Sequence, residues 1–267
     1  MQHREFLKNA KRKRDKGKNS STSRHYTGSE STPNKNDGTT SSAFTAPIKP
    51  EILERDPLLL NIGAMRRESD WIAVNSQASS QFGYSNEIDV VRKMHNLFGF
   101  PNGSVSALYS SHTLEHGSFG DGELDDVLME WKRVLRPGGL LLVSVPDLPT
   151  LATMYVDPAL SFSQHWMVTR MIYGAQVDAD DYHKIGFDET LLAYYLQKHG
   201  FCDLQRVENF NLPFQDTSSM IYAGYTISLN MVAYSCEIKG QNNGPQISHR
   251  ATPYTGPSRL HRTEEKQ

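Results

Sequence analysis

The stretch 104–148 constrains the fold most, because it has the pattern of a complete strand, loop, helix, turn and strand. Apolar runs at 105–109 and 140–145 are flanked by turn residues, which is typical of buried strands. The segment between them carries an apolar stripe at spacings of three and four: Leu124, Val127, Leu128, Trp131, Val134 and Leu135. The sequence Arg-Pro-Gly-Gly at 136–139 ends this predicted helix. Strand, helix and strand in this order predict parallel strands joined by a right-handed crossover.

Further apolar runs extend this unit into a sheet. They lie at 58–62, 71–74, 88–91, 201–207 and 225–234, and helical patterns occur at 147–155, 163–173 and 189–199. Eight residues separate the first two runs, so a parallel pairing between them needs a short, irregular connection. The last two have no helix between them and favour an antiparallel pair. We predict an α/β, Rossmann-like fold: a mostly parallel seven-stranded sheet with an antiparallel closing strand and helices on both faces.

The two ends of the chain differ in composition from its middle. Residues 1–50 contain 11 Lys or Arg and 4 Asp or Glu, whereas the whole chain has a net charge of −2, so the remainder is acidic. The basic run 8–18 is interpreted as a nuclear-import signal, a weak contact with nucleic acid, or a solvated tail. We predict disordered tails at 1–50 and 238–267 and a folded domain at 51–237, because the tails have too few apolar residues to offset ordering entropy.

Cysteine content and hydropathy bear on the compartment. Cys202 and Cys236 are the two cysteines, which excludes a disulfide framework and a zinc-thiolate cluster and fits a reducing environment. No stretch approaches the roughly 20 apolar residues of a membrane span, and the first residues lack the apolar segment of a secretory signal. We expect an intracellular protein, cytoplasmic or nuclear, with no membrane contact.

The loop at 111–116, with the sequence SHTLEH, is the expected site, because parallel sheets bind ligands beyond the carboxyl ends of their strands. Its last five residues match H-x-x-E-H, a helical zinc motif. Two histidines four residues apart need a continuous helical turn to share a face, and Gly117 interrupts any helix directly after His116. We therefore predict no metal site in this loop.

With these elements in place, the chain resembles the class I S-adenosylmethionine-dependent methyltransferases, in particular the methyltransferase type 11-like family. The motifs that carry the resemblance are Leu60-Asn61-Ile62-Gly63, Trp71-Ile72-Ala73-Val74, the loop 111–116, the block 130–148, and His183-Lys184-Ile185-Gly186-Phe187. The resemblance spans about residues 58–236. It implies S-adenosylmethionine as the cofactor and an unidentified methyl acceptor, either a small molecule or a macromolecule.

The resemblance also implies which loops hold the cofactor. In such proteins a glycine-rich turn after the first strand approaches the methionine moiety, an acid at the end of the second strand holds the ribose hydroxyls, and a loop after the third strand contacts adenine. Carried over residue by residue, the cofactor-binding positions are Gly63, Ala64, Met65, Asn75, Met94, His95, Asn96, Leu97, Ser111 and His112.

Three of these loops depart from the family pattern. Met65 replaces a glycine, Asn75 replaces the ribose-binding acid, and Lys93 stands where relatives often carry aspartate. An amide keeps one acceptor but loses the charge, and charge-assisted hydrogen bonds are stronger than neutral ones. Two hypotheses therefore stay open: an active methyltransferase, or a cofactor-binding-impaired pseudo-methyltransferase that acts as a protein or RNA interaction module.

His112, His116 and His183 are the candidate catalytic residues, because histidine titrates near ~6.5 and some acceptors must lose a proton during methyl transfer. The alternative for His112 and His116 is that they fix the loop through backbone hydrogen bonds. For His183, in the acidic loop 178–187, the alternatives are closing the site and capping the following helix. Asp147 has the position of a helix N-cap.

Overall fold

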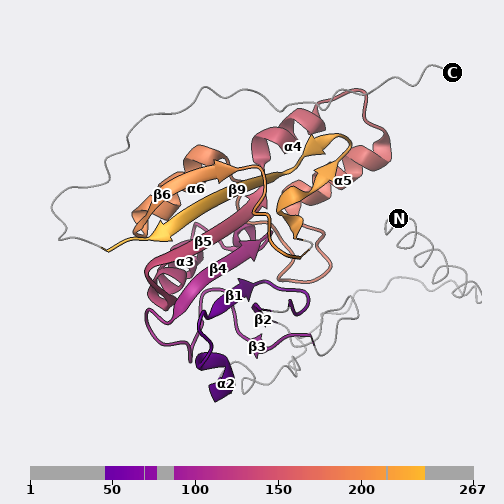
Figure 1. The fold of residues 1–267 in the computed structure, drawn as a ribbon. Helices are drawn as coiled ribbons and strands as arrows, with labels where there is room; N and C mark the ends of the chain where they lie inside the picture. Colours follow the sequence, from indigo (N-terminus) through magenta and orange to yellow (C-terminus); the bar gives the residue numbers. More distant parts are fainter. Residues whose placement is uncertain (1–45, 69, 77–86, 215, 238–267) are drawn as a thin grey trace, which may run out of the picture. The chain divides into compact units, whose positions relative to one another are not determined.

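The computed structural model describes residues 46–68, 70–76, 87–214 and 216–237 (Figure 1). The predicted tail 238–267, the basic run 8–18 and most of the predicted tail 1–50 lie outside the described residues. Within the last residues of that first tail, Ile48 is buried in the hydrophobic core, and helix α2 (Pro50–Leu53) begins. Residues 46–50 of the predicted tail therefore belong to the described domain.

Seven strands form one sheet in the order β3-β2-β1-β4-β5-β9-β6. Their bounds are β1 (Leu59–Ile62), β2 (Ile72–Asn75), β3 (Val90–Val91), β4 (Val105–Ser111), β5 (Leu135–Pro146), β6 (Phe201–Val207) and β9 (Ser228–Ser235). All neighbouring pairs in this sheet are parallel except the two that β9 makes with β5 and β6. The predicted fold class, a mostly parallel Rossmann-like sheet with an antiparallel closing strand, is confirmed.

The first connection is short, as its length predicted. Strands β1 and β2 pair in parallel with Leu60 opposite Ile72, and the described residues between them contain no helix. The chain turns at Gly63, where the backbone has a φ of +79°. This left-handed conformation favours glycine and lets the chain reverse without a helical crossover.

The unit predicted from 104–148 forms as strand β4, helix α3 (Glu123–Val134) and strand β5. The apolar stripe of α3 is fully buried against the sheet, with Trp131 at its centre. Strand β5 begins at Leu135, before the Pro-Gly-Gly turn, and its register with β4 shifts between Val105 and Ala107. The glycines therefore lie in an irregularity between two segments of extended chain.

The two faces of the sheet are covered by different kinds of structure. Alternate strand residues pack with α3 and with α6 (Glu189–Lys198) in the main core. On the opposite face, Trp71 and Tyr109 make edge-on ring contacts with aromatic side chains of the loop after β6, Phe210 and Phe214. In the described part of the chain, this aromatic loop thus covers the part of the second face around Trp71 and Tyr109, where the prediction of helices on both faces expected a helix.

A smaller apolar cluster lies beside the closing strand. Helices α4 (Leu148–Tyr155) and α5 (Phe162–Tyr173) pack there on the hairpin of β7 (Ile221–Tyr222) and β8 (Tyr225–Thr226). The single strand predicted at 225–234 is therefore divided into β8 and β9. Asp147 occupies the N-cap position of α4, but its carboxylate accepts from Thr150 Oγ1 at 2.8 Å and Arg206 Nη2 at 3.1 Å instead of capping the helix backbone.

Cys202 and Cys236 form a disulfide between the start of β6 and the residue after β9, with Cα atoms 5.9 Å apart. The sequence analysis took the two cysteines to fit a reducing environment, which this bond does not support, and it did not predict the bond, because two cysteines alone do not indicate whether they meet. Among the described residues, no helix is long and apolar enough to cross a membrane.

Candidate functional site

A cleft of about 290 Å³ opens at the carboxyl ends of β1, β2 and β4. Strand β1 lies between β2 and β4, so the chain leaves β1 in one direction and later returns on its other side. This is the topological switch point at which doubly wound sheets bind ligands. The opposite wall is formed by residues of the α5–α6 loop, which we define as 174–188, and by Glu123 of α3.

The structure brings most of the predicted cofactor-binding residues together in this cleft. Those that line it are Gly63, Met65, Asn75, Met94, His95 and His112. The other four lie beside it: Ala64 and Leu97 are buried, Asn96 Oδ1 accepts from Phe98 N at 3.1 Å, and the Ser111 hydroxyl bonds to that of Thr217. The sequence analysis did not assign the lining residues Thr113, Glu123, Asp178, Asp180, Asp181 and Lys184 to the cofactor site.

A side chain at Gly63 would be strained in this fold. A Cβ at this position would overlap Oγ1 of Thr113, and the φ of +79° strains any residue with a side chain. Thr113 itself is held by a hydrogen bond from its Oγ1 to Ser111 O at 3.1 Å. The turn after β1 and the loop after β4 are therefore in direct contact, and this contact shapes the floor of the cleft.

Asn75 has a structural reason for its departure from the family's acid. Its Nδ2 donates a hydrogen bond to Ala64 O at 2.8 Å. A carboxylate has no donor and would place an oxygen against that carbonyl oxygen. Asn75 therefore ties the end of β2 to the turn after β1. No pattern in the sequence signals this bond, because its partner is a backbone carbonyl.

His112 is held by hydrogen bonds that define its protonation. Its Nε2 lies 2.9 Å from Ser228 Oγ, and Ser228 Oγ donates its proton to Thr217 O at 2.9 Å. Nε2 must therefore be the donor to Ser228, which leaves the lone pair on Nδ1, 3.7 Å from Glu115 Oε1. Burial lowers the pKa of His112 to about 4, so the ring is neutral near pH 7. This geometry favours the interpretation that His112 fixes the loop.

Glu115 is the central buried group of the loop. It lies in the short 3-10 helix η1 (Leu114–His116), and the residue is 1% exposed. Neither carboxyl oxygen has a hydrogen-bond partner among the described residues. Burial raises its pKa to about 8, which favours the protonated acid near neutral pH. Its backbone carbonyl accepts from Lys184 N at 2.8 Å and Ile185 N at 3.3 Å, so the α5–α6 loop is attached to η1.

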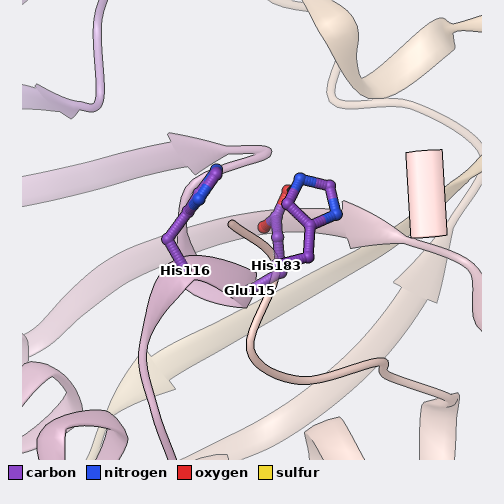
Figure 2. A group of neighbouring side chains, drawn as sticks. All are labelled: Glu115, His116 and His183. Carbon is purple, nitrogen blue, oxygen red and sulfur yellow. Dashed lines mark ion pairs between the residues drawn. The ribbon is translucent and has the colours of Figure 1, made fainter. Parts of the chain in front are cut away.

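His116 and His183 meet beside Glu115. Figure 2 shows Glu115 and His116 projecting from the same short helix, while His183 reaches them from the α5–α6 loop. The two imidazole rings are edge-on with centroids 4.8 Å apart, and His183 Nε2 lies 3.8 Å from Glu115 Oε1. His116 Nδ1 lies 3.1 Å from Tyr182 O. The three predicted histidines therefore gather around an acid that the sequence analysis did not assign a catalytic role.

The electrostatic environment keeps these histidines uncharged. Burial, and to a smaller extent the neighbouring His116, lower the pKa of His183 to about 4. Burial also lowers the pKa of His116, against the opposing effect of the Tyr182 carbonyl. The alternative that His183 caps the following helix is wrong, because Asp188 caps α6 by accepting from Leu191 N at 2.7 Å.

Comparisons with known proteins show what this domain is similar to. Residues 69–143 match the profile of the methyltransferase domain family Methyltransf_11. This match, together with the seven-stranded sheet and its antiparallel strand, confirms the predicted resemblance of the described domain to the class I S-adenosylmethionine-dependent methyltransferases. Within that class, the resemblance is to the methyltransferase type 11 family. No curated protein matches the chain.

The chain is also similar to solved structures that are distant from it in sequence. A chain in the complex of the Haloferax volcanii Trm112 activator with a methyltransferase is 11% identical over 67% of this chain and 82% of that chain (TM-score 0.39). An Archaeoglobus fulgidus SAM-dependent methyltransferase is 15% identical over 66% and 85% (TM-score 0.42). An exported protein of Bordetella parapertussis is 12% identical over 67% and 62% (TM-score 0.42), so this chain spans less than two thirds of it.

Proposed function

We propose that this protein is an S-adenosylmethionine-dependent methyltransferase with an acceptor still to be identified. The observation that carries the proposal is the cleft at the switch point of the sheet, lined by all three loops that the family uses for the cofactor. Its volume of about 290 Å³ lies near the lower end of small-molecule sites, which run from roughly 300 to 1,000 Å³. When bound, the cofactor would supply an electrophilic methyl group.

The charges in the cleft fit such a cofactor. S-adenosylmethionine carries a sulfonium, an ammonium and a carboxylate group, and the cleft is lined by acidic residues of the α5–α6 loop, Asp178, Asp180 and Asp181, as well as by the basic residues Arg92, Lys93 and Lys184. They are attached to the site through the α5–α6 loop, whose backbone bonds to Glu115. The acidic residues of this loop would interact favourably with the cationic groups of the ligand, and the basic residues with its carboxylate.

The chain's own residues would act mainly by positioning. Methyl transfer is an in-line displacement in which orientation supplies much of the acceleration. His112 would hold the loop after β4 in place, since its Nε2 is bonded to Ser228. If the methyl acceptor carries a proton, His116 is better placed than His112 to remove that proton. Its Nδ1–H is held by Tyr182 O, which leaves a lone pair on Nε2, and the residue lines the cleft.

A second candidate is the pseudo-methyltransferase, and two observations favour it. The Asn75 amide is bonded to Ala64 O, and the Met65 side chain lies in the cleft where relatives have glycine. In this case the basic run 8–18 would supply a weak contact with nucleic acid. Salt-sensitive RNA binding that is lost on deleting residues 1–45 would support that role. The deletion ends at 45 because Ile48 belongs to the core.

Calorimetric titration of the full-length protein with S-adenosylmethionine and with its demethylated product tests the primary proposal. Saturable micromolar binding of both ligands is expected, and it would justify an acceptor screen. No binding at millimolar ligand, with circular dichroism showing a folded protein, would overturn the enzyme proposal and favour the pseudo-methyltransferase.

A further inference from the structure

The buried carboxyl of Glu115 requires something to offset its burial. Both of its oxygens lack a hydrogen-bond partner among the described residues, and the residue is 1% exposed. Burying a polar group without a partner is costly, and burying a charged one costs more, unless a proton or a cation neutralises it. The groups around Glu115 show which kind of cation could do so.

Two imidazoles offer nitrogen ligands to the same point. Ligand atoms of Glu115, His116 and His183 all lie within 4.8 Å of one another. A backbone carbonyl can only accept a hydrogen bond, so Tyr182 O, 3.1 Å from His116 Nδ1, places the ring proton on Nδ1 and the lone pair on Nε2. Such a carbonyl bond on the non-ligating nitrogen is the usual outer support of a metal-bound histidine.

We propose that Glu115, His116 and His183 bind one divalent transition-metal ion, with zinc as the preferred ion. Two imidazoles and one carboxylate form the ligand set of many zinc sites with an open fourth position. Imidazole ligands favour zinc and its neighbours over magnesium or calcium. Tetrahedral bonds of about 2.0–2.1 Å place ligand atoms about 3.4 Å apart, so the three side chains need to approach by an ångström or somewhat more.

This site differs from the one that the H-x-x-E-H motif suggested. That motif would use His112 and His116 on one helix, but Nε2 of His112 is bonded to Ser228 Oγ. The structure instead supplies the second histidine from the α5–α6 loop, 67 positions after His116 in the sequence. The proposed site, made from two segments, departs from the prediction that this loop holds no metal.

The ion would have two consequences for the molecule. It would join η1 to the α5–α6 loop, which forms one wall of the cleft, and its fourth position would face the cleft on the side of His116. It would also occupy Nε2 of His116, so that this nitrogen could not take a proton from the methyl acceptor. Metal binding and the base role of His116 are thus mutually exclusive.

The test uses untagged full-length protein, stripped with a chelator and titrated with Zn²⁺ by calorimetry, and with Co²⁺ by visible absorption, without reductant so that the Cys202–Cys236 bond stays closed. One Zn²⁺ per chain and the absorption bands of four-coordinate Co²⁺ are expected. Glu115→Gln and His183→Gln should each weaken binding ~100-fold or more. His165→Gln is the matched control, because this partly exposed histidine of α5 lies outside the cluster.

Several results would overturn the proposal. One is failure of the wild-type protein to bind Zn²⁺, and another is a Co²⁺ spectrum typical of octahedral coordination. A third is a Zn²⁺ affinity of His183→Gln that equals that of the wild type and of His165→Gln. Zn²⁺ should also raise the melting temperature of the wild-type protein, a measurement that needs no variant. If the melting temperature does not rise, the result counts against the site even where the variants do not fold. All measurements are made without S-adenosylmethionine, so a failure of cofactor binding leaves this test intact.

Discussion

The two halves of the sheet differ in strand length and in the site residues that they carry. Strands β1, β2 and β3 have four, four and two residues, whereas β4, β5, β6 and β9 have seven, twelve, seven and eight. The short half and the turns that follow its strands contain all three departures from the family pattern, at Met65, Asn75 and Lys93. The long half carries the loop 111–116 and approaches the α5–α6 loop.

The difference lies in what the polar groups bond to. In the short half, the Asn75 side chain is hydrogen-bonded to the turn after β1. A side chain expected to bind the cofactor therefore stabilises the protein's own turn. In the long half, Glu115 is buried with its oxygens unpartnered and histidines around it. The Asn75 amide in the short half therefore has a hydrogen-bond partner within the protein. The Glu115 carboxyl in the long half has none among the described residues and is free to bind a ligand. Four predictions test this contrast.

The largest effect is expected from Gly63→Ala in the short half. The added Cβ overlaps Thr113 Oγ1, and the left-handed backbone adds strain, so we expect a loss of about 2–4 kcal/mol in unfolding free energy. Cofactor affinity should fall at least ~100-fold, because the floor of the cleft must shift. Urea denaturation and calorimetry measure the two effects.

Gly120→Ala is the control, because a Cβ there meets nothing within 4 Å and its φ is not positive. The double variant Gly63→Ala with Thr113→Ala should recover part of the stability, since the clashing atoms are removed. Equal stability of Gly63→Ala and Gly120→Ala would show that the contact between the two loops does not constrain the turn.

In the long half, Tyr109 should make stability depend on alkaline pH. Burial under the aromatic loop raises its pKa to about 12, so the folded state retains the phenol proton that the unfolded state loses near 10. Its contribution is complete below pH 10 and is lost as the pH rises through 12, by about 2–3 kcal/mol. Urea denaturation from pH 8 to 11.5 should show this loss in the wild-type protein and a smaller loss in Tyr109→Phe. The exposed Tyr194→Phe variant should behave as wild type.

Asn75→Asp tests whether the hydrogen bond within the protein explains why this position carries an amide and not the family's cofactor-binding acid. The change removes the donor to Ala64 O and opposes two oxygens, so we expect a loss of about 2 kcal/mol and no gain in cofactor affinity. Asn209→Asp is the matched control, because Asn209 uses its Oδ1 as an acceptor for Asn211 N, which aspartate can replace. Tighter cofactor binding by Asn75→Asp would mean that the amide bond is not the reason for this residue.

The smallest effect is expected from Ser228→Ala in the long half. It removes the acceptor of His112 Nε2–H and the donor to Thr217 O, for a loss of about 1 kcal/mol. Thermal unfolding measures the loss, and Ser163→Ala, at an exposed position on α5, is the control. If both variants melt at the same temperature, the chain from His112 to Thr217 contributes nothing measurable to the loop.

Much of the fold could be predicted because its signals are local. The apolar stripe of α3, the two runs around it and the Pro-Gly-Gly turn lie within 45 residues, and each depends on periodicity or on the chemistry of proline and glycine. The same local signals placed the loop 111–116 at the end of a strand, and the fold rule for parallel sheets then located the cleft. Motif resemblance supplied the cofactor positions, six of which line that cleft.

Tertiary structure alone decided what those residues bond to. The bond from Asn75 to Ala64 O, the packing of Thr113 on Gly63 and the approach of His183 to Glu115 each join segments that are distant in sequence. No periodicity records such contacts, because they depend on how loops at the ends of different strands converge once the sheet is assembled. The strands could therefore be predicted from the sequence, but the partners of the buried acid could not.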